Sequence, residues 1–192
     1  KKLTGGLDAM AKMRKVNHVQ GYATFLDEHS VEVALTNSDE KTKITFEYCI
    51  IAAGSQSSKM SFIPHEDPRV WDSTDALEVK EVPKKLLILG GGIIGLEMGT
   101  VYSTLGSQVD VAIRGEQLMT GTDADIIKLY TKANSNRFNI MTKTQTQSII
   151  PKNEGIYVEF KGENAPKEGI LYDAVLVALG RSANGNKLGL EN

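Results

Sequence analysis

The feature that most constrains this chain is a strand, a glycine-rich turn, a helix and a second strand, all within residues 85–114. Consecutive apolar residues at 86–89 predict a buried strand of a parallel sheet, and residues 109–113, apolar except for Asp110, predict a second strand. Between the two runs the pattern G-x-G-x-x-G occupies residues 90–95 and opens a helical pattern. This is the context that the dinucleotide-binding fingerprint requires.

Each glycine of the pattern has a physical role in such a site. Gly90 can adopt the dihedral angles of a tight turn, Gly92 lets the backbone approach a pyrophosphate, and Gly95 lets the helix pack closely on the strand. The N-terminus of the helix presents unpaired N–H groups and a partial positive charge to that pyrophosphate. Glycine-rich turns also serve as plain connectors, but the flanking strands and helix favour the dinucleotide site.

Composition gives no reason to expect nucleic acid or a membrane as a partner. The formal net charge of the 192 residues is −2, which gives no electrostatic reason to expect nucleic acid or an anionic membrane surface. No apolar run reaches the roughly 18 residues that a membrane-spanning helix needs. The single cysteine cannot form an internal disulfide, which fits a reducing compartment, and we expect a cytoplasmic protein.

The rest of the chain divides into two predicted parts. Residues 1–66 contain a helix end, three alternating segments typical of an antiparallel meander, and an apolar strand at 49–53. Residues 67–192 contain the glycine turn, a second helix whose stripe is Ile126, Tyr130 and Ala133, a hairpin near Pro151 and a final apolar strand. The expected fold is α/β, with a parallel sheet, an antiparallel β-meander and a further β-rich part.

Several motifs together resemble the flavin-dependent pyridine nucleotide–disulfide oxidoreductases. They are IIAAGS (50–55), WDSTDAL (71–77), GGGIIGLEMG (90–99) and YDAVLVALGR (172–181). Within that family the likeness is greatest to the dihydrolipoamide dehydrogenase group of bacteria. The resemblance runs through the whole chain in order, and it implies an internal piece: part of an FAD domain (1–66), then an NAD domain (67–192).

The resemblance implies an activity for the full-length protein: oxidation of dihydrolipoamide, with electrons passing through a cysteine pair and FAD to NAD+. It places the CxxxxC pair before this chain and the acid–base His–Glu couple after it, so the chain alone is expected to be inactive. It also implies a homodimer that serves 2-oxoacid dehydrogenase complexes. Cys49 lies in an apolar run and is expected to be a buried thiol, not a redox partner.

The resemblance also assigns site residues. Those expected to bind NAD are Gly90, Gly91, Gly92, Ile93, Ile94, Gly95, Glu97, Ile113, Arg114, Thr146, Gly180 and Arg181. Those expected to line a partial FAD site are Gly21, Ala23, Ala53, Gly54 and Ser55. Glu97 matches a glutamate beside the nicotinamide, although an ordinary solvated helix residue is the alternative. His18, His29 and His65 have no metal-ligand spacing, and no metal site is expected.

The second strand departs from the pattern for NAD. NAD-specific proteins end this strand with a carboxylate that accepts hydrogen bonds from the adenosine ribose. Here Ile113 and then Arg114 occupy that end, a pair that resembles NADP-binding reductases, in which arginine pairs with the 2′-phosphate. Gly95 and Thr120, however, differ from the Ala and second Arg that are usual in NADP-using relatives. NAD is the expected cofactor and NADP the alternative.

Two other functions stay open from the sequence. One is an NADPH-dependent disulfide reductase or soluble pyridine nucleotide transhydrogenase of the same superfamily, favoured by Ile113 and Arg114. The other is a non-catalytic nucleotide-binding module, because one architecture hosts many functions.

Overall fold

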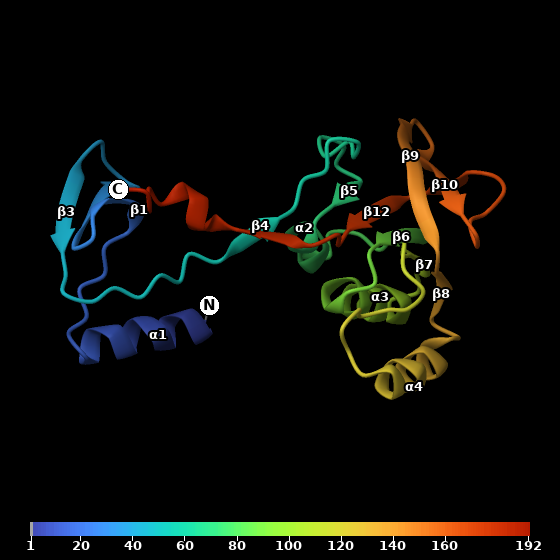
Figure 1. Ribbon diagram of the computed structural model, residues 1–192, viewed down its shortest axis with the longest axis horizontal. Coiled ribbons are helices and arrows are strands. Elements are labelled where there is room, and N and C mark those ends of the chain that lie inside the picture. Colours follow the sequence, from blue (N-terminus) through green and yellow to red (C-terminus); the bar gives the residue numbers. More distant parts are fainter. Residues whose placement is uncertain (1) are drawn as a thin grey trace. The chain divides into compact units, whose positions relative to one another are not determined.

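The computed structural model describes residues 2–192, with side chains from Thr4 onward (Figure 1). The chain divides into two compact units. One contains the chain up to Ser55 together with 183–192, and the other spans 56–182. Over the residues described, none of the helices combines the length and apolar character needed to span a bilayer.

The first unit contains a helix and an antiparallel meander. Helix α1 spans Lys2–Met13, and the strands are β1 (Gly21–Asp27), β2 (Ser30–Leu35) and β3 (Lys41–Thr45). The strand order is β1-β2-β3 and both pairings are antiparallel, as the alternating sequence predicts. The C-terminal residues pack here through a 3₁₀ helix (Asn184–Lys187) and a hydrogen bond of 2.8 Å from Phe25 N to Leu188 O.

The predicted apolar strand at 49–53 is wrong. These residues form no strand, Cys49 is exposed rather than buried, and Ile50 is 94% exposed. An apolar run becomes a strand only where neighbouring strands accept its backbone hydrogen bonds, and no described strand pairs with this one. The chain instead forms the short strand β4 (Ser55–Ser57) just afterwards.

A five-stranded parallel sheet forms the centre of the second unit. Its order is β5-β12-β6-β7-β8. From β6 the chain continues outward through β7 to β8, and β12 then pairs with the other side of β6. The bounds are Val70–Trp71 for β5, Lys85–Leu89 for β6, Gln108–Ala112 for β7, Phe138–Met141 for β8 and Ala174–Val177 for β12. The strand order therefore reverses between β6 and β12, where doubly wound sheets bind ligands.

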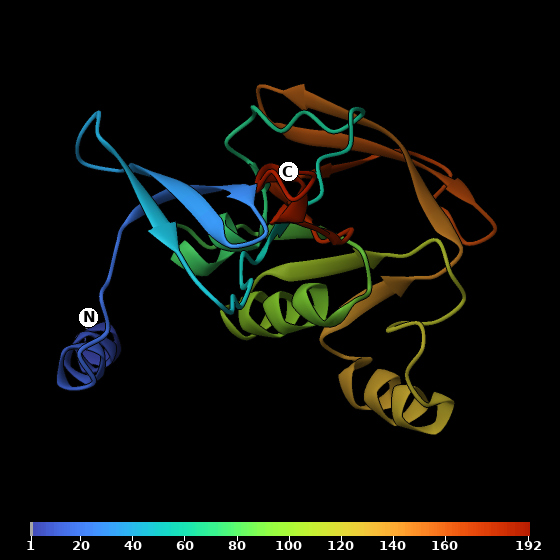
Figure 2. The ribbon, with the colours of Figure 1, turned by 60° about the vertical axis from the view of Figure 1, so that its left-hand side comes forward.

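Helices cover one face of this sheet (Figure 2). They are α2 (Ser73–Glu78), α3 (Ile93–Thr104) and α4 (Ala124–Asn134). Asp72 caps α2 in a capping box and Asp123 caps α4. The core of this face includes the following side chains from strands and helices: Leu86, Ile88, Val109, Val111, Leu96, Met98, Tyr102 and Ile127.

An antiparallel meander covers the opposite face of the sheet (Figure 2). Its strands are β9 (Thr144–Lys152), β10 (Gly155–Gly162) and β11 (Ile170–Tyr172), in the order β11-β10-β9. Leu87 and Leu89 of β6 pack on this side, whereas Leu86 and Ile88 pack against the helices. The alternation explains why the strand reads as continuously apolar. The sheet and the meander confirm the predicted α/β fold.

The compact units divide the chain elsewhere than the prediction of 1–66 and 67–192. The second unit begins at Gln56, because Ile63 is buried in the same core as Val70. It ends at Ser182, and the residues from Ala183 onward group with the first unit. Strand β13 (Arg181–Ala183) pairs with β4.

Candidate functional site

A cavity of about 490 Å³ opens at the carboxyl ends of β6, β7 and β12. Its walls are the glycine turn, the end of β7, the start of β9 and the residues after β12. The lining residues are Met60, Phe62, Leu89, Gly90, Gly91, Gly92, Ala112, Ile113, Arg114, Gly115, Gln117, Met119, Thr120, Thr144, Gln145, Thr146, Ala178 and Leu179. Its size lies within the range of small-molecule sites, and its position obeys the rule for open parallel sheets.

The three glycines of the fingerprint have distinct geometries. Gly90 has φ +108°, and a Cβ there would lie 2.4 Å from Ala178 O. A Cβ on Gly95 would lie 2.4 Å from Gly90 O, so this glycine lets α3 approach β6 closely. At Gly92, by contrast, an added Cβ would meet no atom within 4 Å. The fold therefore needs Gly90 and Gly95, whereas the space at Gly92 is open to a ligand.

Helix α3 begins at the cavity with Gly92 as its N-cap and with no side-chain cap. The N–H groups of its first turn therefore have no capping side chain, which suits an anion. Ile93 is 65% exposed and Glu97 is also exposed, while Ile94 is half-buried. These three residues of the predicted site lie on α3 beyond the cavity lining.

The end of β7 carries no carboxylate toward the cavity. Ile113 is 6% exposed and closes the cavity beside Gly91, where an added Cβ would lie 2.7 Å from Ile113 Cγ2. Arg114 is exposed, and among the described residues it is the one charged side chain that lines this cavity.

Two acidic residues near Ile113 in the sequence are held by other partners. Asp110 is buried inside the sheet, where Tyr172 OH and Asn139 Nδ2 donate to its oxygens at 2.8 and 3.0 Å. Glu116 forms an ion pair with Lys143, with 3.2 Å between Oε1 and Nζ. Neither carboxylate lines the cavity.

The remaining residues predicted for NAD lie around β9 and β12. Thr146 lines the cavity together with Thr144 and Gln145 at the start of β9. Gly180 has φ +120° and its carbonyl accepts a hydrogen bond of 3.1 Å from Ser58 N. Arg181 approaches Ser73, with 3.5 Å between Nη1 and Oγ. The structure thus brings six predicted residues into one cavity: Gly90, Gly91, Gly92, Ile113, Arg114 and Thr146.

Sequence reasoning missed the residues that close the cavity from the loop after β4. Met60 and Phe62 lie in a segment without apolar periodicity, just before the predicted division at residues 66 and 67. A hydrogen-bonded turn holds this loop, with 3.2 Å between Met60 N and His65 Nε2, and Ile63 anchors it in the core. No local sequence pattern predicts that Met60 and Phe62 line the cavity, because the other lining residues lie far along the chain.

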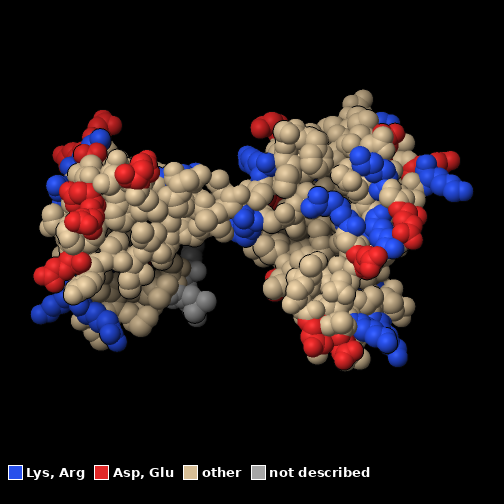
Figure 3. Space-filling model, in the orientation of Figure 1, with Lys and Arg blue, Asp and Glu red and all other residues tan. Residues whose placement is uncertain are grey.

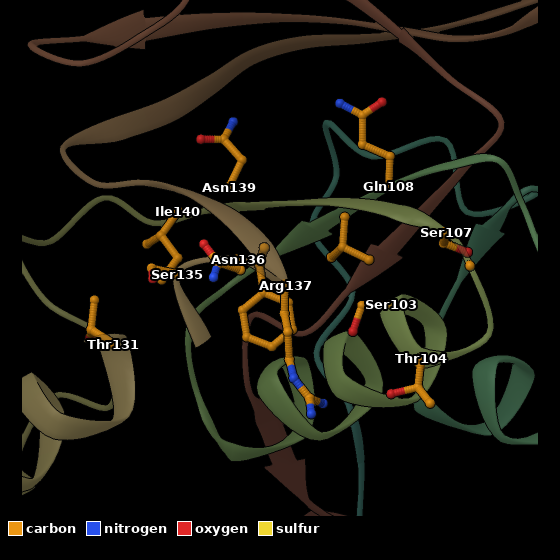
Figure 4. A pocket seen from close by; sticks show the side chains of 13 residues that line it. Ser103, Thr104, Ser107, Gln108, Thr131, Ser135, Asn136, Arg137, Asn139 and Ile140 are labelled. Carbon is orange, nitrogen blue, oxygen red and sulfur yellow. The ribbon is translucent and has the colours of Figure 1, made fainter. Parts of the chain in front are cut away.

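A second, larger groove of about 830 Å³ lies at the opposite edge of the sheet (Figure 4). The ends of α3 and α4 and the starts of β7 and β8 line it, and Figure 4 shows Gln108 and Asn139 above the strands and Ser103, Thr104 and Arg137 below. Helix C-termini carry a partial negative charge, which disfavours a phosphate. The smaller cavity at the glycine turn is therefore the better candidate for a nucleotide.

The residues predicted to line FAD all lie in the first unit. A Cβ on Gly21 would lie 2.3 Å from Ala34 O, so strand pairing accounts for this glycine. Ala53 O and Gly54 O accept hydrogen bonds from Asn184 at 3.0 and 3.1 Å. Ala23 lies in β1 and Ser55 in β4. The carbonyl groups of Ala53 and Gly54 thus already have partners inside the unit. The FAD site stays a prediction.

Surface charge gives no sign of a polyanionic ligand on the face drawn in Figure 3, where acidic and basic side chains are interspersed on each unit. Among the described residues, no group of three or more His, Cys, Asp or Glu side chains has a geometry that could hold a metal ion.

Residues 1–192 match the family model described as pyridine nucleotide-disulphide oxidoreductase. The chain belongs to this family. The resemblance carried by the four sequence motifs is thereby confirmed. The match covers the glycine turn, the parallel sheet and the antiparallel meander.

Similar curated proteins include dihydrolipoyl dehydrogenases of several bacteria. The chain is 54% identical over 189 residues to a dihydrolipoyl dehydrogenase of Vibrio cholerae serotype O1, and the match covers 98% of this chain and 39% of that protein. It is 53% identical over 184 residues to a dihydrolipoyl dehydrogenase of Haemophilus influenzae, covering 96% of this chain and 38% of the relative. The chain thus spans about two fifths of the length of these relatives.

Solved structures of a flavoprotein disulfide reductase and of an NADPH oxidase have a similar fold. A copper(II) complex of a cysteine-to-serine mutant of RclA, an HOCl-induced flavoprotein disulfide reductase from Escherichia coli, matches with a TM-score of 0.84. Identity is 26%, over 98% of this chain and 42% of that chain. An engineered water-forming NADPH oxidase bound to NADPH has a TM-score of 0.69 at 19% identity, over 84% of this chain and 37% of that chain, which is a likeness of fold alone.

Proposed function

We propose that this chain forms the pyridine nucleotide site of a flavin-dependent oxidoreductase of the dihydrolipoyl dehydrogenase type. The observation that carries the proposal is the cavity at the carboxyl ends of β6, β7 and β12, lined by Gly90, Gly91 and Gly92. This cavity lies where the strand order reverses and where an uncapped helix begins. A pyrophosphate is the ligand group that fits both features.

The residues of the chain have separate tasks in this proposal. Gly92 leaves room for the pyrophosphate, and the first turn of α3 supplies N–H donors to its oxygens. Thr144, Gln145 and Thr146 offer polar groups along one wall of the cavity. Ile93 and Glu97 lie on the exposed side of α3, beyond the glycine turn, and would border the nicotinamide half. The bound nucleotide supplies the hydride-carrying ring, and these residues orient it.

NAD is the proposed nucleotide because the similar curated proteins are named dihydrolipoyl dehydrogenases. The reaction of the full-length protein is then the oxidation of dihydrolipoamide by NAD+, through FAD and a cysteine pair outside this chain. We further propose a cytoplasmic homodimer that serves a 2-oxoacid dehydrogenase complex. The first unit would contribute backbone positions to the FAD site.

NADP is the second candidate, and a specific observation favours it. Ile113, an apolar residue, directly follows β7 where NAD-specific proteins have a carboxylate. Arg114 comes next, and among the described residues it is the charged side chain that lines the cavity. An arginine there suits a 2′-phosphate, and an apolar neighbour offers no acceptor to ribose hydroxyls. An NADPH-dependent reductase or a soluble transhydrogenase of the family would share this arrangement.

Calorimetric titration of the full 192-residue chain with NADH, and separately with NADPH, tests the proposal. Binding of either nucleotide is expected, and Gly92→Val should abolish it because the new side chain occupies the approach of the pyrophosphate. Tighter NADH supports the dihydrolipoyl dehydrogenase type, and tighter NADPH moves the chain to the second candidate. Unchanged affinity in Gly92→Val contradicts the site.

A further inference from the structure

The turn between β8 and β9 is joined to the end of β7 by a short ladder of backbone hydrogen bonds. Ile113 N donates to Met141 O at 3.0 Å, Thr144 N to Ile113 O at 2.9 Å, and Lys143 N to Gly115 O at 2.9 Å. Lys143 is therefore fixed directly beside the residues that follow β7. In dinucleotide-binding sheets this strand end faces the adenosine ribose.

The Lys143 side chain binds two carboxylates in this position. Its ammonium lies 2.9 Å from Glu163 Oε2 and 3.2 Å from Glu116 Oε1. Lys143 is the more buried of the partners, at 35% side-chain exposure against 68% for Glu163 and 81% for Glu116. The two carboxylates, Glu163 first, raise the pKa of the Lys143 ammonium above its ordinary value, so the lysine is charged at neutral pH.

Lys143 also has a backbone conformation that a lysine rarely adopts. Its φ is +47°, in the left-handed region that glycine or asparagine occupies at lower cost. The side chain of a lysine makes this backbone conformation unfavourable. Its side-chain contacts with Glu116 and Glu163 therefore offset a local preference for other residues.

We propose that Lys143 is a specificity-determining residue of this nucleotide site. By binding Glu116, an exposed carboxylate three residues after Ile113, it holds this carboxylate away from the adenosine ribose and so raises the affinity for NADPH relative to NADH. The inference rests on the proposed function, because it assigns the cavity to a pyridine nucleotide. It does not depend on which nucleotide binds more tightly overall, because Lys143 changes the ratio of the two affinities.

The chemistry follows from the charges at this end of the cavity. Asp110 is buried and already accepts two hydrogen bonds, so of the two acidic residues that flank Ile113 in the sequence only Glu116 is exposed and free to change its side-chain rotamer. Free of Lys143, its carboxylate would repel a 2′-phosphate and accept hydrogen bonds from ribose hydroxyls. Paired with Lys143, it leaves Arg114 as the charge that faces the ligand.

Titrations of the full chain with NADPH and NADH at about 50 mM salt test the inference. Lys143→Met should raise the ratio of the NADPH to the NADH dissociation constant about tenfold, by releasing Glu116. The double variant Lys143→Met/Glu116→Gln should return the ratio to within about twofold of the unsubstituted chain. Lys143→Arg, which keeps the ion pair, should leave it unchanged.

Lys80→Met is the matched control, because Lys80 forms an exposed ion pair with Glu78 outside the cavity and its loss changes the net charge equally. An unchanged ratio in Lys143→Met overturns the inference while leaving the proposed function intact. An undiminished shift in the double variant also overturns it, because the lysine charge would then act without Glu116. Binding of neither nucleotide by the unsubstituted chain overturns the proposed function and the inference together.

Discussion

The hydroxyl of Tyr172 donates a hydrogen bond of 2.8 Å to Asp110 Oδ2 in the interior of the second unit. Tyr172 is 1% exposed and Asp110 3% exposed, and Asn139 donates to the other carboxylate oxygen at 3.0 Å. The three residues belong to β11, β7 and β8, so the contact ties the meander to the parallel sheet. Burial of a carboxylate is tolerated where its oxygens accept such bonds.

Tyr172→Phe should therefore lower the free energy of unfolding by about 1–3 kcal/mol, because it leaves one oxygen of buried Asp110 without its donor. Urea unfolding of the full chain followed by circular dichroism measures the change. Tyr157→Phe is the matched control, since Tyr157 is only half-buried and no hydrogen bond of its hydroxyl is described. Equal stability of Tyr172→Phe and the unsubstituted chain would contradict a stabilising role.

Alkaline pH should destabilise the chain through the same tyrosine. Burial, and then the charge and hydrogen bond of Asp110, raise the pKa of Tyr172 above its ordinary value of about 10. A raised pKa in the folded state means that this contribution is complete below about pH 10 and is lost as the pH rises further. Urea titrations from pH 8 to about pH 11 should show a smaller alkaline loss in Tyr172→Phe, and parallel curves would refute the assignment.

Gly92 and Gly95 should respond differently to valine. Gly92→Val should abolish nucleotide binding with a loss of stability of at most about 1 kcal/mol, because a Cβ at this position meets open space. Gly95→Val should cost about 2–4 kcal/mol, since its Cβ would overlap Gly90 O. Calorimetric titration and thermal unfolding separate the two effects. Equal destabilisation of both variants would show that Gly92 is required by the fold.

Arg114→Ala should weaken NADPH about ten- to a hundredfold, the loss of one charge-assisted contact, and change NADH by less than about threefold. Titrations at low and high salt provide the measurement, with the difference shrinking as salt screens the charge. Arg137→Ala, in the groove at the opposite edge of the sheet, is the control. Equal weakening of both nucleotides would make Arg114 a general phosphate contact.

The second unit should fold when residues 56–182 are produced alone, because both hydrophobic cores of the parallel sheet lie within it. Trp71, the one tryptophan of the chain, is 8% exposed and its ring centroid lies 5.6 Å from that of Tyr102. Its fluorescence emission should therefore stay at the wavelength of a buried indole and shift in one cooperative urea transition. An emission typical of exposed tryptophan would contradict an independent fold.

The sequence pattern predicts helix α4 correctly, but it does not predict which face of the helix is buried. The stripe Ile126, Tyr130 and Ala133 was expected inside, yet Ile127 is buried, Ile126 is 55% exposed and Ala133 is exposed. Tyr130 packs against the core as expected. Several apolar residues in one helix allow more than one stripe, and the angle at which the helix meets the sheet selects between them.

The same limit applies to the apolar run at 49–53. Its residues match a buried strand, and only the positions of other strands decide whether backbone partners are present. The sequence predicts a division into two parts, but it does not predict that residues 183–192 pack with the first unit. Their partners lie at the far end of the sequence, so no local pattern could reveal this contact.

What the sequence determined by itself is the strand, glycine turn, helix and strand of residues 85–114, together with the α/β fold around them. These features are local, because strand and helix periods and the conformational freedom of Gly90 are properties of adjacent residues. Tertiary structure decided which charges face the cavity. Asp110 accepts a hydrogen bond from Tyr172, and Glu116 forms an ion pair with Lys143. Each partner lies far along the chain, so a local sequence pattern cannot predict the contact.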